Sequence, residues 1–485
     1  MYVMGLDIGT TCTKALLTDE KGQVTSVESS GYPLISSGCR IEQEPNEWIK
    51  ASILAVKKAV KSIDVSSIKG ISLSTQGGST VAVDEKGQFI GNSVTWMDNR
   101  ASVEAKEVEK ELGGTYIYRT SGWKINPSLD AAKIRCLKKD PAYKKAKKWL
   151  STLEVMNRFL TGNAIIDPTN AASRQLYNLE KNDWDDKLLQ SAHIDRSELP
   201  EILPTGAEVG RLCKEAADQM GLPEGIPVFN GAHDQYCASI GAGAVCAGDM
   251  LLSAGTTWVL MGISTTPLFT KSCIAPGRHP VEDLYGAMVS LICSGASLQW
   301  FKNEFLSEDF ERINEEASKR RNKIKDVFFY PYLAGAGYPI WNTNAKGAFV
   351  GLTLEHDRYD FARAIMEGVA FGVKRGVEDF VKNGCDINQM IIMGGASKSS
   401  LWCQMVASIT QIPIIKLEQA DGCAMGAAMI AAHNLGIYKS YHEAAREMVK
   451  KAGTYEPVAE EVIFYNKKFC CFDKMWNLME KYYSE

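Results

Sequence analysis

The sequence lacks the signatures of several large protein classes. It contains neither a Gly-x4-Gly-Lys-[Ser/Thr] pattern nor a Gly-x-Gly-x-x-Gly pattern, which argues against P-loop and Rossmann nucleotide sites. Its 13 cysteines are scattered, with no Cys-x-x-Cys pair and no cysteine and histidine cluster at zinc spacing. No window reaches the ~18 consecutive apolar residues of a membrane-spanning helix, and the N-terminus has no apolar signal segment. We therefore expect a cytoplasmic protein with reduced thiols.

The charge balance narrows the kinds of partner. The formal net charge is −4 and no basic cluster occurs, so the chain has no general attraction for nucleic acid or an anionic membrane. Hydrophobic residues make up 45% of the chain and charged residues 23%, as in ordinary globular proteins. We expect a small-molecule substrate and neither a nucleic acid nor a membrane as partner. The oligomeric state stays open, with a homodimer as one alternative.

A repeated triplet divides the chain into two similar halves. A chain of 485 residues is too long for one hydrophobic core. Gly9-Thr10-Thr11 follows a strand-like segment over residues 1–8, and Gly255-Thr256-Thr257 follows another over residues 250–254. We therefore predict one fold used twice, with domains over residues 1–245 and 246–485.

Hydrophobic periodicity predicts mixed α/β structure in both halves. The predicted strands cover residues 2–8, 13–18, 23–27, 68–74, 250–253, 258–263, 285–290 and 390–393. The predicted helices cover residues 45–60, about 358–383 and 464–483, and the charged segment 438–462 is predicted to be exposed helix and loop. Strands and helices that alternate in this way favour a mixed sheet of the α/β class.

The two Gly-Thr-Thr turns are candidate phosphate sites. A glycine- and threonine-rich turn behind an apolar strand presents backbone N–H groups and hydroxyls, which are the donors that hold phosphate oxygens. Lys14, on the strand after the first turn, could reach the same phosphates. Asp7 directly precedes that turn, and a carboxylate beside phosphates is repulsive unless a hard cation lies between them. Asp7 therefore predicts Mg²⁺, although a solvated turn aspartate is the alternative interpretation.

Asp234 is the strongest single candidate for catalysis. It follows the apolar segment 228–233 and precedes the small residues 238–243, so we expect it to open a closely packed helix. A carboxylate at this place could accept the proton of a substrate hydroxyl and share the metal with Asp7. A helix N-cap requires the same residue type at the same place, so the residues alone leave both interpretations open.

These motifs, taken in chain order, resemble the FGGY family of carbohydrate kinases over essentially the whole length. Residues 5–14 resemble its phosphate-binding opening, Asp234 in Gly-Ala-His-Asp-Gln aligns with its catalytic acid, and residues 255–257 match its second phosphate turn. Residues 394–399 match its adenosine loop, residues 421–428 its next helix start, and residues 347–367 its C-terminal signature. The N-terminal signature departs at Cys136, where the family usually has tryptophan.

The resemblance implies both a fold and a cofactor set. The fold is α/β, with two actin-like (RNase H-like) domains and an interdomain catalytic cleft. Residues 1–245 would bind the sugar and carry the first phosphate turn, and residues 246–485 would bind ATP. ATP and Mg²⁺ are the implied cofactors. The implied nucleotide-binding residues are Gly9, Thr10, Thr11, Lys14, Gly255, Thr256, Thr257, Gly394, Gly395, Ala396 and Ser399.

The resemblance also suggests where the acceptor binds. Residues 96–100 resemble the Trp-x-Asp-x-Arg stretch of xylulokinase-like members, in which an aspartate and an arginine contact sugar hydroxyls. The loop over residues 74–80 carries Gly77-Gly78, where glycerol kinases have Arg-Glu and xylulokinases have Met-His-Gly, so glycerol is disfavoured. Two glycines leave room for a larger substrate or for side chains from elsewhere. The predicted substrate-binding residues are Gln76, Gly77, Trp96, Asp98, Arg100 and Asp234.

We therefore predict an ATP-dependent kinase for a hydroxyl of a ketose or polyol, with a pentulose such as D-xylulose as first choice. L-Xylulose, ribulose, erythritol, xylitol and glycerol are alternative acceptors within the family. A non-catalytic actin-like nucleotide-binding module is the alternative from another class, and it would not need an acid at Asp234. The sequence leaves open whether Trp123, Trp258 and Trp341 line the sugar site or the core.

Overall fold

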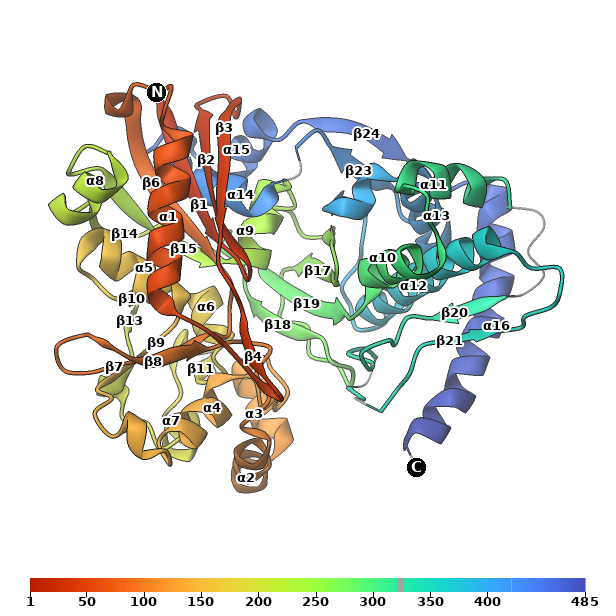
Figure 1. Ribbon diagram of the computed structural model, residues 1–485, viewed down its shortest axis with the longest axis horizontal. Coiled ribbons are helices and arrows are strands. Elements are labelled where there is room, and N and C mark those ends of the chain that lie inside the picture. Colours follow the sequence, from red (N-terminus) through yellow and green to blue (C-terminus); the bar gives the residue numbers. More distant parts are fainter. Residues whose placement is uncertain (321–326, 340, 343, 420, 485) are drawn as a thin grey trace. The chain divides into compact units, whose positions relative to one another are not determined.

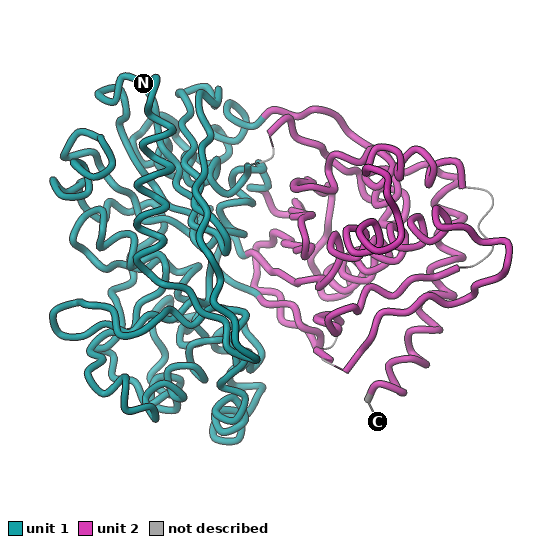
Figure 2. Tube along the Cα trace, viewed as in Figure 1, with its two compact units in different colours: residues 1–245, 276–285, 421–449 teal, residues 246–275, 286–420, 450–485 magenta. Residues whose placement is uncertain are grey.

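The computed structural model describes residues 1–320, 327–339, 341–342, 344–419 and 421–484. They form two units, which Figure 2 distinguishes by colour. Unit 1 comprises residues 1–245, 276–285 and 421–449, and unit 2 comprises residues 246–275, 286–420 and 450–485. The first break therefore lies between residues 245 and 246, where we expected the domain boundary, but the chain later returns to unit 1 twice.

Unit 1 is built on a six-stranded sheet with the strand order β14-β15-β6-β1-β2-β3. The strands are β1 (Tyr2–Ile8), β2 (Cys12–Asp19), β3 (Val24–Gly31), β6 (Ile68–Thr75), β14 (Glu208–Arg211) and β15 (Pro227–His233). β1, β2 and β3 form an antiparallel meander, and β1 and β15 both run parallel to β6. Parallel strands end at the same edge of a sheet, so the residues that follow β1, β6 and β15 meet there.

Helices cover this sheet, and a second sheet is inserted in unit 1. Helix α1 (Pro45–Ala59) begins with proline at its first position and packs against β2 and β3 (Figure 1). The second sheet has the order β4-β5-β8-β7-β9, with β4 (Ile35–Ser37), β5 (Arg40–Gln43), β7 (Thr80–Val83), β8 (Phe89–Val94) and β9 (Lys148–Leu150). The other unit 1 helices include α2 (Ser102–Leu112), α3 (Gly114–Ser121), α4 (Asp130–Leu137), α5 (Thr152–Thr161), α6 (Pro168–Ala172), α7 (Asp186–Ser191), α8 (Lys214–Met220), α9 (Asp234–Gly241), α14 (Gly422–Asn434) and α15 (Tyr441–Met448).

Unit 2 repeats the plan of the unit 1 sheet. Its sheet includes, in spatial order, β19 (Tyr285–Leu291), β17 (Trp258–Ser264), β16 (Asp249–Ala254), β22 (Gln389–Met393), β23 (Ile414–Leu417) and β24 (Lys451–Tyr455). β16 pairs antiparallel with β17 and parallel with β22, as β1 does with β2 and β6. The order β3-β2-β1-β6-β15-β14 therefore has its counterpart in β19-β17-β16-β22-β23-β24, and the prediction of one fold used twice is confirmed.

The helices of unit 2 pack around a large aromatic and aliphatic core. They are α10 (Ser294–Phe305), α11 (Phe310–Ser318), α12 (Arg358–Lys382), α13 (Ser400–Thr410) and α16 (Ala459–Ser484). A capping box of Asp357 and Asp360 starts α12, near the expected residue 358. Trp258 belongs to this core, because it is fully buried and its ring centroid lies 4.8 Å from that of Trp402. β24 was not predicted, because it lies inside the segment 438–462 that we expected to be helix and loop.

Two backbone-close crossings hold α14 in unit 1. A Cβ atom at Gly5 of β1 would overlap the carbonyl oxygen of Ala424, and one at Gly426 would overlap that of Cys237 in α9. Only glycine permits such an approach of helix to strand and of helix to helix. These contacts explain why residues 421–449 lie with unit 1 although they follow the unit 2 strands in the chain.

Candidate functional site

Asp7 and Asp234 lie at the same edge of the unit 1 sheet. Asp7 is the penultimate residue of β1 and pairs with Ser74 of β6, and Asp234 follows directly on β15 as the first residue of α9. The Ser74 hydroxyl donates to Asp7 Oδ1 over 2.8 Å. The expectation that Asp234 opens a closely packed helix is therefore confirmed, since α9 is buried over residues 236–241.

The electrostatics of this edge are unusual for a turn aspartate. Burial is the largest cause that raises the pKa of Asp7 to about 7, and the nearby carboxylates of Asp234 and Asp421 raise it further. The Ser74 hydrogen bond and the Lys14 ammonium act in the opposite direction. Only 9% of Asp7 is exposed, so the alternative of a solvated turn aspartate does not fit the structure. A bound cation would reduce the repulsion between these carboxylates.

Asp421 belongs to this cluster, and our site prediction omitted it. It is the N-cap residue of α14, yet its side chain caps no backbone N–H and pairs with the ammonium of Lys14 instead. Lys14 lies opposite Asp7 in the β1–β2 hairpin. An aspartate before Gly-Cys-Ala at a helix start was visible in the sequence. Its partner 407 positions away was not.

The raised pKa of Asp7 makes a prediction about stability. The folded protein retains a proton on Asp7 that the unfolded chain releases above pH 4, so stability should fall as pH rises from about 4 to 7. An Asp7→Asn variant should lack this slope and, at pH 8, have a free energy of unfolding roughly 2–4 kcal/mol higher, since one pKa unit is worth ~1.4 kcal/mol. Chemical unfolding at pH 5 and pH 8, without nucleotide or divalent cation, measures both. The exposed Asp218→Asn variant is the control, and an unchanged slope in Asp7→Asn would contradict this account.

The first Gly-Thr-Thr turn bonds to residues at the ends of two other strands, β5 and β8. Gly9 N–H donates to the Cys12 carbonyl over 3.1 Å and closes the turn. The Thr10 carbonyl accepts from Gln43 Nε2 over 2.6 Å, and its hydroxyl accepts from Trp96 Nε1 over 3.2 Å. Thr11 is exposed at the tip. These bonds fix the backbone of the turn, and its tip at Thr11 stays accessible to a ligand.

Gln76 follows β6 and links the candidate acceptor loop to that turn. Its Nε2 donates to Gln43 Oε1 over 2.7 Å, and Gln43 in turn holds the Thr10 carbonyl. Its Oε1 is buried and accepts no hydrogen bond from any residue that the structure describes. A buried acceptor without a donor costs free energy unless a ligand or water supplies one, so Gln76 fits the expected contact with a hydroxyl.

Side chains from elsewhere occupy the space at Gly77 and Gly78. A Cβ atom at Gly77 would overlap the His233 ring, and Gly78 adopts a left-handed conformation (φ 66°) with Trp96 close by. Lys133 is fully buried and donates to the carbonyls of Gly78 over 2.5 Å and of Val94 over 3.1 Å. Burial lowers the pKa of Lys133 to about 8. Of the two possibilities left open for the glycines, the structure shows neighbouring side chains.

Asp98 and Arg100 bond to one another. Arg100 donates through Nε to Asp98 Oδ1 over 2.9 Å and through Nη2 to Oδ2 over 2.7 Å, and it also bonds Glu42. Asp98 is fully buried and accepts from the Ile41 backbone as well, and these bonds lower its pKa against the opposing effect of burial. Sugar contacts by Asp98 and Arg100 stay a prediction, and this geometry favours a supporting role beside the exposed Trp96.

In unit 2 the glycine turns of two neighbouring strands meet. Gly255 follows β16 and Gly394 follows the parallel strand β22, and a Cβ atom at Gly394 would lie 2.8 Å from the Ala254 carbonyl oxygen. Gly394 has a left-handed φ of 88°, whereas a Cβ atom at Gly395 would meet no atom of the described residues within 4 Å. The glycine pair therefore leaves open space at the strand ends, as a nucleotide site requires.

The remaining predicted residues of unit 2 have different environments. Gly255 and Thr256 are exposed, Thr257 is half-buried and Ala396 is buried. Ser399 is the N-cap of α13, where its hydroxyl accepts from Trp402 N–H and donates to Asn314 Oδ1 over 2.7 Å. Its hydroxyl is thus already bonded, and a nucleotide contact of Ser399 stays a prediction. Trp341 is 52% exposed and Trp123 is half-buried, so neither is a core residue.

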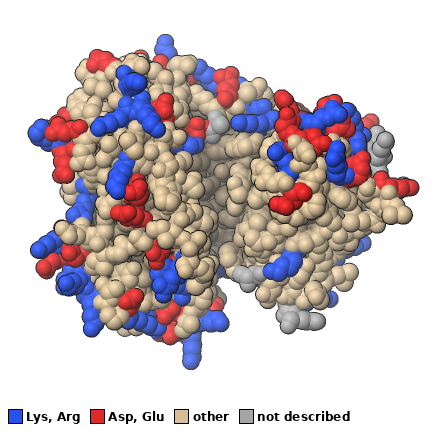
Figure 3. All heavy atoms as spheres, viewed as in Figure 1, with Lys and Arg blue, Asp and Glu red and all other residues tan. Residues whose placement is uncertain are grey.

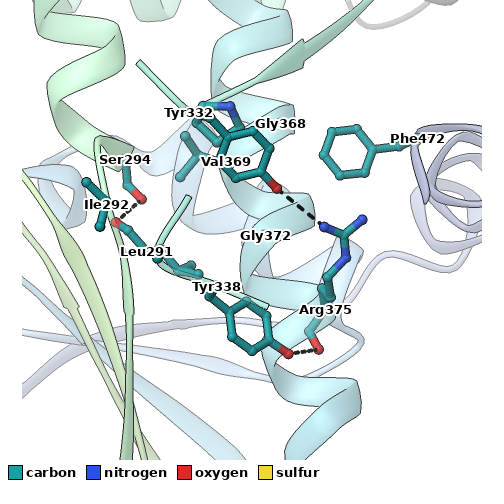
Figure 4. Close-up of a pocket in the computed structure, with 12 residues that line it drawn as sticks. Leu291, Ile292, Ser294, Tyr332, Tyr338, Gly368, Val369, Gly372, Arg375 and Phe472 are labelled. Carbon is teal, nitrogen blue, oxygen red and sulfur yellow. Dashed lines mark hydrogen bonds between the residues drawn. The ribbon is translucent and has the colours of Figure 1, made fainter. Parts of the chain in front are cut away.

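A separate small pocket lies within unit 2, between α12 and the segment that connects the antiparallel strands β20 (Phe328–Tyr330) and β21 (Ala348–Val350), and the segment over residues 291–294 and Phe472 of α16 also line it. Figure 4 shows Tyr332 and Tyr338 pointing toward Arg375 of α12, with the Phe472 ring nearby. Arg375 already donates to Asp473 over 2.7 Å, and the Tyr338 hydroxyl donates to the Arg375 carbonyl over 3.0 Å. The polar groups of this pocket already bond to neighbouring residues, so we interpret the pocket as a packing gap without a ligand role.

The described residues form no large patch of one charge sign on the face of the molecule shown in Figure 3. On the face shown in Figure 3, lysine and arginine side chains are interspersed with aspartate and glutamate side chains. Among the described residues, no helix combines the length and apolar character that a membrane crossing needs.

Both halves of the chain match known protein domains. Residues 2–241 match the N-terminal domain of the FGGY family of carbohydrate kinases, and residues 250–435 match its C-terminal domain. A xylulose kinase of Bacillus subtilis is 28% identical over 482 residues, which cover 98% of this chain and 96% of that protein. A gluconokinase of the same organism is 28% identical in an alignment of 505 residues, which covers 100% of this chain and 97% of that protein. The solved structure of ligand-bound xylulose kinase from Lactobacillus acidophilus matches with a TM-score of 0.94 at 27% identity, covering 100% of this chain and 99% of that one.

Proposed function

This chain belongs to the FGGY family of carbohydrate kinases and is an ATP-dependent sugar kinase, and from that premise we propose that it phosphorylates a hydroxyl of a neutral pentulose such as D-xylulose. The α/β fold with two actin-like domains agrees with the matched structures. The alternative of a non-catalytic nucleotide-binding module is set aside by the family match.

Asp234 is the proposed general base. It follows β15 at the edge where Asp7 and Lys14 also lie, and it is one-quarter exposed, so a hydroxyl can reach it. Its carboxylate would orient the acceptor hydroxyl and take its proton as the new O–P bond forms and the bond between the γ-phosphorus and the β,γ-bridging oxygen breaks, releasing ADP. The single observation that carries this assignment is the convergence of Asp7, Lys14, Asp234 and Asp421 in one cluster.

We propose that the two Gly-Thr-Thr turns bind phosphate oxygens and that Gly394 and Gly395 leave room for the adenosine. Asp7 and Asp234 would hold Mg²⁺, which neutralises phosphate charge when it is bound. Among the described residues no three His, Cys, Asp or Glu side chains form a closed metal site. This fits Mg²⁺, which is usually held by one or two carboxylates together with substrate phosphates and water. Lys14 would exchange its bond to Asp421 for a phosphate oxygen.

The cations of the acceptor side favour a neutral acceptor over gluconate. The Lys133 ammonium donates hydrogen bonds to the carbonyls of Gly78 and Val94, and Arg100 is paired with Asp98 and Glu42. A carboxylate substrate would need an available cation, because a buried charge without a partner is costly. The Arg-Glu pair of glycerol kinases is missing at Gly77-Gly78, which disfavours glycerol.

The acceptor panel is the deciding experiment. We expect an assay coupled to ADP release to give the highest kcat/KM with D-xylulose among D-xylulose, L-xylulose, ribulose, xylitol, erythritol, glycerol and gluconate. A preference for gluconate would overturn the argument from the paired cations. ADP release that no member of the panel accelerates would overturn the proposed function.

A further inference from the structure

The imidazole of His233 occupies the space that a side chain on the acceptor loop would fill. A Cβ atom at Gly77 would overlap both Cδ2 and Nε2 of His233, so the ring lies directly against the Gly77 backbone. His233 is the last residue of β15 and lies opposite Thr75 of β6, two residues before Gly77. The loop without side chains and the histidine from the neighbouring strand are therefore complementary in shape.

One nitrogen of this ring has a partner and the other faces the loop. His233 Nδ1 accepts from the Gln235 backbone N–H over 3.2 Å and lies 2.9 Å from Asp234 Oδ1. No described residue bonds to Nε2. The Gln235 N–H requires a bare Nδ1 and so a proton on Nε2, whereas the Asp234 carboxylate favours a proton on Nδ1. Nε2 is therefore a donor in the first tautomer and in the imidazolium, and an acceptor in the second tautomer. In each form Nε2 is the ring nitrogen that can form a hydrogen bond with a hydroxyl beside Gly77.

The surroundings hold this imidazole ring in place. His233 is 9% exposed, and its backbone N–H donates to Thr169 Oγ1 over 2.8 Å. The Thr169 hydroxyl donates in turn to the fully buried Asp167 over 2.6 Å, and the Tyr236 ring meets the imidazole edge-on at 6.2 Å. A side chain that is fixed by its own backbone and by packing loses little freedom on binding, which suits a recognition role.

We propose that His233 is a specificity-determining residue whose Nε2 forms a hydrogen bond with an oxygen of the acceptor next to the hydroxyl that is phosphorylated. The proposal rests on the function proposed above. Because His233 Nδ1 lies 2.9 Å from Asp234, the proposed general base, we expect the oxygen bound at Nε2 to neighbour the reacting hydroxyl. The acceptor class is thus a vicinal diol or hydroxyketone, and strand β15 supplies the polar group that the Gly77-Gly78 loop lacks.

The test compares two replacements that separate hydrogen bonding from packing. Phenylalanine in His233→Phe fills the space of the ring but donates nothing, and glutamine in His233→Gln keeps an N–H donor. We expect His233→Phe to raise KM for the acceptor by about 10-fold, the effect of one lost hydrogen bond, and to leave KM for ATP unchanged. His233→Gln should recover KM to within about 3-fold. His442→Phe, at an exposed position of α15, is the matched control.

A second pair of variants tests the contact without relying on the histidine alone. Gly77→Ala must displace the ring, so we expect it to raise KM for the acceptor as His233→Phe does. In a His233→Ala background the added methyl group would meet only Ser173 Oγ, at 3.0 Å, among these close contacts, so Gly77→Ala should have a much smaller further effect. An unchanged acceptor KM in His233→Phe, or equal changes in KM for ATP and acceptor, would overturn the proposal. Wild-type activity on the panel decides the proposed function separately, and a wild-type enzyme inactive on every acceptor overturns both.

Discussion

An Asp234→Asn variant is expected to phosphorylate the acceptor about 10²–10⁴-fold more slowly than the wild type, which is the usual contribution of a positioned general base. Asparagine keeps the size of the side chain and can accept a hydrogen bond, but it cannot take the proton of the hydroxyl. The carboxylate lies at the first residue of α9, is one-quarter exposed and is not the N-cap of that helix, so the substitution removes the proposed proton acceptor and we expect the fold to be retained.

The measurement is ADP release at saturating acceptor and ATP, together with ATP affinity and thermal unfolding. We expect the affinity for ATP measured without a divalent cation to stay within about 3-fold of wild type, because the Gly-Thr-Thr turns are untouched. Asp218→Asn is the matched control, since Asp218 is exposed on α8 and bonded only at the surface to Lys214. Wild-type turnover in Asp234→Asn would remove this acid from the mechanism.

A Gly426→Ala variant is expected to lower the free energy of unfolding by about 3 kcal/mol, the upper part of the usual range for overpacking a core. The new methyl group would overlap the carbonyl oxygen of Cys237, which belongs to the backbone of α9 and cannot rotate away. The two helices must separate, and Asp234 and Asp421 at their N-terminal ends must move with them. The better helix propensity of alanine, ~1 kcal/mol, offsets only part of the cost.

Chemical unfolding followed by circular dichroism measures this loss, and activity measured below the unfolding transition should fall as well. Gly453→Ala in β24 is the matched control, because no atom of the described chain lies within 4 Å of its Cβ position and its φ is not left-handed. We expect the control to stay within about 0.5 kcal/mol of wild type. An unfolding midpoint of Gly426→Ala equal to that of wild type would contradict the close helix crossing.

The sequence predicted local elements and single residues well, and pairings poorly. The strands around both Gly-Thr-Thr turns and the helix that Asp234 opens follow from short-range periodicity and turn chemistry, and the structure confirms them. The bond between Lys14 and Asp421 and the contact of the His233 ring with Gly77 join residues 407 and 156 positions apart. No periodicity within one segment carries that information, which is why Asp421 and His233 were absent from the predicted site.

Asp98 and Gly77 were recognised in the sequence, but their partners were not. The Trp-x-Asp-x-Arg stretch was recognisable in the sequence, but only the fold shows that Asp98 and Arg100 satisfy one another in a buried bidentate pair. The glycines at positions 77 and 78 left two interpretations, and the neighbouring strand decided between them. Whether a polar side chain is available to a ligand depends on its partners, and those come from other elements.

The sequence by itself determined the duplicated α/β plan, the two Gly-Thr-Thr turns at strand ends and the places of Asp7 and Asp234 beside strands, because turn chemistry and strand periodicity act over a few residues. The tertiary structure alone decided that α14 returns to unit 1, that Asp421 pairs with Lys14, and that burial and like charges raise the pKa of Asp7 to about 7. The physical reason is that desolvation, Coulomb interactions and glycine-mediated close packing depend on distances in space, which chain positions do not specify.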